Sequence, residues 1–289
     1  MTTFIRYAFY PILFLAMLSY AFFELQQPSA RLGSYYGYYL TALISLMLAV
    51  EFLHPLRKQW RMTWHSLWRR DLPFMLLGGV TLAAANYFAG VLILYLGMSR
   101  GEMHIGLPLF PAVVLALIIP DFIWYWVHRY SHESTSRLGN WFWRMHLAHH
   151  LPQQVYLLMH AVSHPINLVI VRLILTLPLF MLGFSTASLF VANLIVGLQG
   201  LVSHYNVDIR AGWWNYILIG TELHRFHHSA DADQAKNYGA VVPLWDLLFG
   251  TFYYRPEQYP VALGVKNAAD YPSDSQLWQV MKLPFVSRR

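Results

Sequence analysis

The chain has 289 residues, of which 57% are hydrophobic and only 12% are charged, well below the roughly 25% charged residues of soluble domains. It contains no cysteine, which excludes disulfides, iron–sulfur clusters and thiolate-ligated haem or zinc. The net charge of +6 does not indicate nucleic-acid binding, because the basic residues lie at the ends of apolar runs. The composition predicts an integral membrane protein in which His, Asp or Glu would bind any metal.

Four apolar runs in the first 127 residues are expected to cross the bilayer, which takes roughly 20 residues of helix. The first run is expected to be a span and not a signal peptide, because no small-residue cleavage site follows it and Glu24 stands where cleavage would fall. The runs lie at about residues 4–23, 38–50, 72–97 and 107–127.

The second connection, residues 57–71, indicates how these spans are oriented. It holds five Lys or Arg, whereas the first and third connections hold only Arg31 and Arg100. Basic loops stay inside, so this connection and the end of the fourth run are predicted to be cytoplasmic. Trp60, Trp64 and Trp68 recur at helical spacing, and the connection is expected to lie flat at the interface.

A further apolar pair at residues 165–184 and 185–202 forms either two short spans or a re-entrant hairpin. In both cases the chain returns to the side that it left. Irregular backbone cannot face lipid, so we predict an all-helical fold. It is a polytopic membrane bundle of about four spans plus an apolar hairpin, with a cytoplasmic histidine-rich helical cap.

Eight histidines stand in three clusters whose members share a helix face, because residues three or four apart lie one above the other. A lone histidine is more often hydrogen-bonded or interfacial than a ligand, but three clusters on one side of a membrane favour a metal site. Eight is too many for one tetrahedral zinc, and imidazole suits iron, zinc, copper and nickel, so the count predicts two ions. The clusters are His128 and His132; His146, His149 and His150; and His224, His227 and His228.

His204 ends the last apolar run and is predicted as a ninth ligand, with an interfacial role as the alternative. Asp208, one helical turn later, is expected to ligate or to orient it. His160 and His164 are weaker candidates, and His164, which precedes a proline, is either near the site or a helix cap. Arg172, inside an apolar run, either binds a lipid headgroup or snorkels, which we favour.

Asp121 and Tyr125 lie on the same helical stripe as the first histidine pair. A carboxylate at membrane depth needs a partner, and metal-bound histidines commonly donate their second N–H to a carboxylate. Asp121 is therefore predicted to support a metal-bound histidine, with a hydrogen bond between packed helices as the alternative.

The segments DFIWYWVHRYSH, HLAHH and LHRFHHSADADQAKNYGAVVPLWDLLFGTF resemble the fatty acid hydroxylase and sterol desaturase superfamily of membrane di-iron oxygenases. The resemblance covers about residues 108–255 and implies two iron ions held by the eight clustered histidines. Some members have a further His-x-x-x-His, which His204 matches and Asp208 does not. The resemblance implies a division of the chain into N-terminal membrane spans (1–106), a fatty acid hydroxylase-like catalytic region (107–255) and a C-terminal tail (256–289).

Oxidation of an unactivated C–H bond needs a cofactor, because no side chain is a strong enough oxidant. Two irons with O2 as cosubstrate would supply it, and no catalytic residue beyond the ligands is expected; zinc could fill the sites in a purified sample. The chain shows no dinucleotide fingerprint, so electrons are expected from a ferredoxin or a cytochrome with its reductase. We predict a lipid hydroxylase, in a bacterial inner membrane more readily than in endoplasmic reticulum.

Three alternatives remain. A lipid or sterol desaturase would use the same ligands. A zinc-dependent membrane hydrolase would need a base like that of H-E-x-x-H, and Glu222 lies near His224 without that pattern. A transporter or a non-enzymatic metal-binding membrane protein would line a path with polar residues, for which Arg172, Asn193 and Gln199 are too few.

Overall fold

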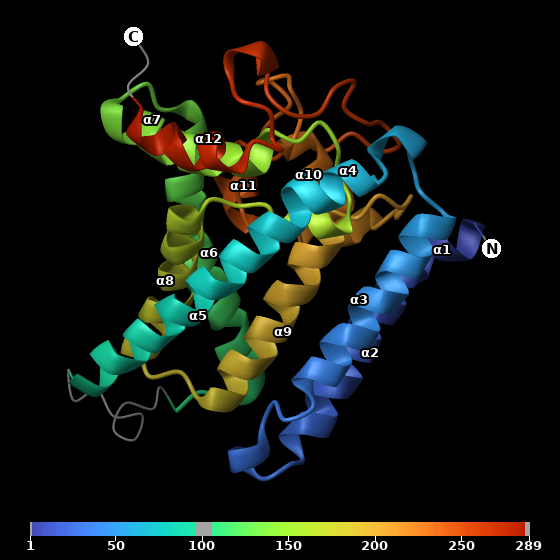
Figure 1. Ribbon diagram of the computed structural model, residues 1–289. Helices are drawn as coiled ribbons and strands as arrows, with labels where there is room; N and C mark the ends of the chain where they lie inside the picture. The colour runs from blue at the N-terminus through green and yellow to red at the C-terminus, as the bar shows by residue number, and fades with distance from the viewer. Residues whose placement is uncertain (1, 96–105, 287–289) are drawn as a thin grey trace.

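The computed structural model describes residues 2–95 and 106–286 and confirms the prediction of an all-helical fold (Figure 1). Within these residues there is no β-strand, only two isolated bridges. Arg100, which entered the orientation argument, lies outside the described residues. The helices are α1 (Thr2–Tyr7), α2 (Phe9–Leu25), α3 (Tyr36–Leu53), α4 (Trp64–Ser66), α5 (Leu72–Tyr95), α6 (Leu109–Glu133), α7 (Arg137–His150), α8 (Pro165–Met181), α9 (Thr186–Ser203), α10 (Thr221–His227), α11 (Leu244–Leu248) and α12 (Leu277–Lys282).

Four described helices are long and apolar enough to cross a membrane, and the chain is an integral membrane protein. They are α3, α6, α9 and the stretch Lys58–Leu92, which includes most of α5. The first predicted span, α2, has 17 residues, as has α8, and each is about 26 Å long against a hydrocarbon core of about 30 Å. The apolar pair therefore consists of two nearly full-length helices.

Local sequence explains where the helices of this pair begin and end. Pro165 occupies the first position of α8, where a missing N–H costs nothing, and the ring of His164 accepts a hydrogen bond from Ile166 N–H at 3.2 Å. Gly183, with φ of +72°, turns the chain between α8 and α9. Ser185 then caps α9 through the N–H of Ser188.

Helix α6 is the centre of the bundle and packs against α7, α8 and α9. Helix α2 packs on the other side of α9, while α5 packs on α8 (Figure 1). Met17, Met47 and Val202 are fully buried in the core that joins α2, α3 and α9. The outer face of α5 is apolar and open, with Leu76 72% exposed, which is the pattern of a lipid-facing helix.

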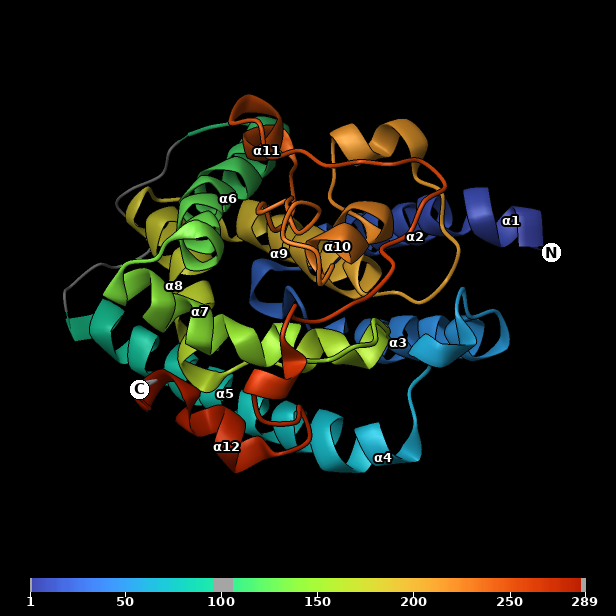
Figure 2. The same ribbon diagram turned by 90° about the horizontal axis from the view of Figure 1, so that it is seen from above.

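A cap of short elements covers one end of the bundle, where α7, α10, α11 and α12 lie together (Figure 1 and Figure 2). The second connection reaches this end: Arg70 is buried and bonds Asp71, Tyr156 and Asp274 of the C-terminal tail. Trp64 and Trp68 are largely exposed, whereas Trp60 is buried against the cap. The connection is thus part of the cap on one side and open on the other.

Candidate metal centre

The histidine patterns come together at the end of the bundle that the cap covers. Nine histidines, each offering one ring nitrogen as a ligand atom, form two groups, and the ligand atoms within each group lie within 4.8 Å of one another. The five-histidine group contains His128, His132, His146, His150 and His227; the four-histidine group contains His149, His204, His224 and His228. These nine are the residues that the sequence predicted as ligands, including His204.

The distances within each group match donors that share one ion. In the five-histidine group, Nε2 of His146 lies 2.8 Å from Nε2 of His128 and 3.0 Å from Nε2 of His150. In the four-histidine group, Nε2 of His204 lies 3.0 Å from Nε2 of both His149 and His224. Nitrogens about 2.1 Å from one ion and at right angles to each other lie about 3.0 Å apart, so both groups fit a metal ion.

Backbone carbonyls set the tautomer of several of these rings. Nδ1 of His149 donates to the carbonyl of Val162 at 3.0 Å. Nδ1 of His204 lies 3.1 Å from the carbonyl of Gly200 and 2.9 Å from Oγ of Ser203, and because that hydroxyl itself donates to the Gly200 carbonyl, Nδ1 of His204 is the donor. In the five-histidine group, Nδ1 of His128 and of His227 likewise donate to the carbonyls of Tyr238 and Lys236. A neutral imidazole whose Nδ1 holds the proton presents a bare lone pair at Nε2, the form that binds metals.

His149 and His204 give the clearest indication of a cation. Both rings spend their only proton at Nδ1, so their two Nε2 atoms face each other at 3.0 Å with no hydrogen between them. Protonating the rings does not resolve the conflict, because burial lowers the pKa of His149 to about 3 and that of His204 well below its usual value. The chemistry of this donor set therefore fits a positive ion between the two nitrogens.

The repeated His-x-x-His-His spacing is explained by how each copy is divided. On α7, His146 and His150 belong to the five-histidine group and His149 to the other. On α10 and its C-cap the assignment is reversed: His224 and His228 belong to the four-histidine group and His227 to the five-histidine group. The rings of His150 and His228, from opposite groups, stack at 4.5 Å. Each copy thus supplies two donors to one group and one to the other.

A neighbouring histidine borders the smaller group without joining it. The ring of His160 lies 5.1 Å from that of His204 and covers Gly200, where a Cβ atom would stand 2.6 Å from His160 Cε1. Only a glycine at position 200 lets this ring approach the helix. His160, a weaker candidate in the sequence, therefore contacts the site by packing against His204 and Gly200.

Asp121 has a different role from the predicted direct partner of a histidine. Its Oδ1 accepts the N–H groups of Ala240 and Val241, both at 2.8 Å. The carboxylate of Asp246 accepts the N–H groups of the two preceding residues, Tyr238 at 2.7 Å and Gly239 at 2.9 Å. Burial raises the pKa of Asp246 to about 6. Two carboxylates therefore fix residues 238–241, whose first carbonyl holds Nδ1 of His128. Sequence reasoning missed Asp246, which stands inside the quoted segment NYGAVVPLWD.

Three further candidates lie outside both groups. Asp208 is not placed as a ligand, because its carboxylate pairs with Arg6 at 2.6 Å and with Arg210 at 2.9 Å. The hydroxyl of Tyr125 contacts Thr251 at 3.0 Å and accepts from Arg129, so it does not touch a histidine of the site. His164 caps α8, as its alternative reading proposed.

Glu51 of α3 was not identified from the sequence, although it holds two backbone segments next to the site. Its Oε1 accepts the N–H of Leu157 at 3.0 Å and that of Asn206 at 2.7 Å. These residues lie beside His160 and His204, so one buried carboxylate ties two segments of the site together. An acid inside an apolar run is the signal that could have found it.

The chain is similar in sequence to known lipid hydroxylases and monooxygenases. Residues 113–251 match the family model of the fatty acid hydroxylases. The chain is 28% identical over 265 residues to the ornithine lipid hydroxylase OlsE of Rhizobium tropici, covering 89% of this chain and 78% of that protein. It is 32% identical over 168 residues to the fatty acid hydroxylase vlmA of Lecanicillium sp and 31% identical over 134 residues to the alkylglycerol monooxygenase of Homo sapiens. These alignments cover 52% and 46% of this chain, and 44% and 28% of those relatives. No solved structure matches the chain.

Proposed function

The chain belongs to the fatty acid hydroxylase and sterol desaturase superfamily, and from this membership we propose that it is a membrane-bound monooxygenase that hydroxylates a lipid. It would use two iron ions, O2 and electrons from a separate protein. The observation that carries the proposal is the pair of bare Nε2 atoms of His149 and His204, 3.0 Å apart in a group of four histidines of which two are buried and two half-buried.

The five-histidine group would hold one iron and the four-histidine group the other. When bound, two irons would supply the activation of O2 that oxidation of an unactivated C–H bond requires. The chain's own contribution is positioning: carbonyls of Gly200, Val162, Lys236 and Tyr238 keep the protons on Nδ1 and aim the Nε2 lone pairs inward. Burial of the rings keeps them neutral and ready to bind metal at physiological pH.

The predicted external electron donor and the orientation belong to the same proposal. The site lies at the capped end of the bundle, and the basic second connection lies at that end too. The positive-inside rule supports a cytoplasmic cap, on which a ferredoxin or a cytochrome with its reductase would dock. A bacterial inner membrane is the membrane we propose.

The alternatives of another class find less support. Glu222, the acid that stands two residues before His224, accepts the Ala211 N–H at 2.7 Å and the Asn215 amide at 2.8 Å, so it is not aimed at the histidines as a hydrolase base. Gln199, one of the polar residues considered for a transport path, bonds Tyr10 and the carbonyl of Ile219 within the helix packing. A desaturase would use the same two groups, and only the product separates it from a hydroxylase.

The test combines metal analysis with lipid mass spectrometry. Protein purified without oxygen should contain two irons per chain, and cells that express it should accumulate a lipid heavier by one oxygen atom. Cells with His149→Ala serve as the control and should lack this product. A product lighter than its parent lipid by two hydrogen atoms would show that the protein is a desaturase and not a hydroxylase. One zinc per chain together with a hydrolysed product would refute the oxygenase.

A further inference from the structure

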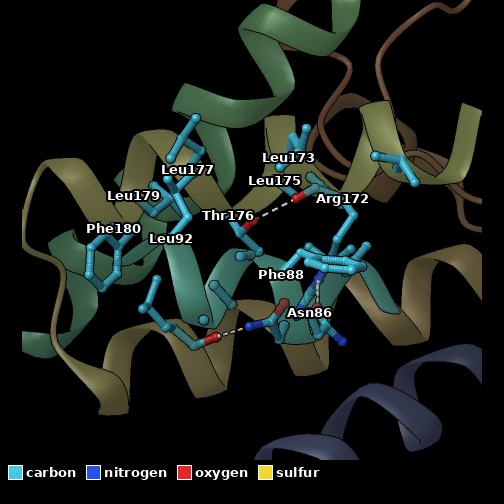
Figure 3. Close-up of a pocket in the computed structure, with 18 of the residues that line it drawn as sticks. Asn86, Phe88, Leu92, Arg172, Leu173, Leu175, Thr176, Leu177, Leu179 and Phe180 are labelled. Atoms are coloured by element: carbon cyan, nitrogen blue, oxygen red, sulfur yellow. Dashed lines mark hydrogen bonds between the residues drawn. The ribbon is translucent and has the colours of Figure 1, made fainter. Parts of the chain in front are cut away.

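A large pocket lies between α5, α8 and α9, in the membrane part of the bundle (Figure 3). Its volume is about 1100 Å³, and its walls are mostly aliphatic and aromatic. Val80 and Phe88, which line it, are also 69% and 68% exposed, so the pocket opens to the surrounding lipid. Such a pocket is large enough for a lipid chain, since ligand pockets run from about 300 to 1,000 Å³.

Arg172 of α8 lines this apolar pocket and departs from the snorkelling that we favoured from the sequence. Its Nε donates to Oδ1 of Asn86 on α5 at 2.8 Å, and Figure 3 shows the side chain directed toward Asn86 beside Phe88. Asn86 is neutral, and among the described residues no carboxylate forms an ion pair with Arg172. A permanently charged guanidinium at membrane depth therefore lacks a counter-ion from the described chain.

The chemistry of the free atoms indicates what would bind there. Only Nε of the guanidinium is used, so both terminal nitrogens remain available as a fork that matches the two oxygens of a carboxylate or phosphate. Asn86 accepts through Oδ1, which leaves its amide nitrogen as a further donor. The free polar atoms of Arg172 and Asn86 are thus all donors. Elsewhere in this largely apolar wall, the hydroxyls of Thr81 and Thr176 and the amide nitrogen of Asn193 donate to carbonyls of their own helices.

We propose that this pocket binds a lipid that carries an anionic group, held by Arg172 and Asn86, with its alkyl chain against the apolar walls. Arg172 follows His164 by eight residues, which places it about 12 Å along α8 from the end beside the histidine groups. A chain bound in the pocket would thus lie within a lipid's length of the metal centre. That this lipid is the substrate rests on the proposed function; that it binds does not.

Binding should be measured on the purified full-length chain in detergent by native mass spectrometry, with hexadecanoate, hexadecyl phosphate and methyl hexadecanoate as probes. We expect one of the two anions to bind more tightly than the neutral ester. Arg172→Gln should weaken the binding of that anion roughly 10- to 100-fold, the effect of losing a charge-assisted pair, and leave the ester unchanged. Arg172→Lys, which keeps the charge but not the fork, should fall between.

The matched control is Arg137→Gln, which removes an exposed arginine at the start of α7 and should leave all three affinities unchanged. The preferred anion identifies the source: hexadecanoate indicates a carboxylate lipid and hexadecyl phosphate a phospholipid. Equal binding of the ester and both anions by the unmodified protein, or an Arg172→Gln variant that keeps its metal and its affinity, would overturn the proposal. If Arg172→Gln loses its metal and does not fold, Asn86→Leu replaces it, with the same expectation.

Because binding is measured without O2 or electrons, it separates the two proposals. Anion-selective binding by a protein that yields no oxidised lipid would uphold the pocket and refute the oxygenase. An oxidised lipid produced equally by Arg172→Gln would uphold the oxygenase and refute the pocket as its substrate site.

Discussion

Replacement of Asp121 tests whether the loop of residues 238–241 positions the metal centre. Asp121 is 1% exposed, and its Oδ1 accepts two backbone N–H groups at 2.8 Å. Asp121→Leu would leave both N–H groups unpaired in the interior, at about 1–3 kcal/mol each, or about 2–6 kcal/mol of unfolding free energy in total. The Tyr238 carbonyl would also lose its fixed position, and with it the orientation of His128.

Asp121→Asn separates the hydrogen bonds from the charge. It keeps an acceptor at Oδ1, and its amide nitrogen would stand where Oδ2 has no partner among the described residues. We therefore expect this variant to lose only about 1–2 kcal/mol. The measurements are the thermal midpoint in detergent and iron per chain, with a loss of roughly 10- to 100-fold in metal affinity for Asp121→Leu.

Asp233→Asn, a change at an exposed loop aspartate, is the control and should match the unmodified protein in both measurements. An Asp121→Leu protein that unfolds at the unmodified temperature and binds the same amount of iron would refute the reasoning. So would an Asp121→Asn variant as damaged as Asp121→Leu, because the hydrogen-bond account requires the two to differ.

Three further predictions concern the histidine groups. His149→Ala leaves three donors in the four-histidine group and should reduce iron from two ions to about one per chain, because the metal-binding free energy of a four-ligand site, about 10–16 kcal/mol, is shared among its ligands. His132→Ala leaves four donors in the five-histidine group and should keep nearly two ions. Equal losses of iron in the two variants would contradict the division into two groups. Gly200→Ala should lower the thermal midpoint, because the new Cβ would stand 2.6 Å from His160. Gly197→Ala on the same helix meets open space and should raise the free energy of unfolding by about 0.5–1 kcal/mol. If both variants were stabilised, the close contact between Gly200 and His160 would be excluded. In chelator, stability should be complete above pH 6.5 and fall as the pH drops toward 3, because the pKa of His149 is about 3 in the folded protein and about 6.5 in the unfolded chain; a midpoint independent of pH in this range would contradict the burial of neutral rings.

The sequence allowed the histidine set to be predicted because its pattern is local. Spacings of three and four residues put side chains on one face of a helix, and this holds whatever the rest of the chain does. The apolar runs place the ends of those helices on one side of a membrane. His204 could be added for the same reason, because it stands at the end of an apolar run and not in an isolated loop.

Partners distant in the sequence could not be predicted in this way. Asp208 has the right spacing from His204 to be a ligand, yet its carboxylate is turned away by Arg6, about 200 residues earlier in the chain. Asp121 lies on the stripe of His128 but reaches the site through a loop 120 residues later. In both cases a long-range contact decides where a side chain points, and helical periodicity contains no information about it.

The division of each His-x-x-His-His box also has a mechanical consequence. His149 and His150 are consecutive, yet they serve different groups, as do His227 and His228. A shift of α7 against α10 therefore moves donors of both groups at once. Two ions held by the two groups would be linked through consecutive residues of the chain. The repeated spacing would thus let imidazoles from adjacent residues serve two metal ions at once.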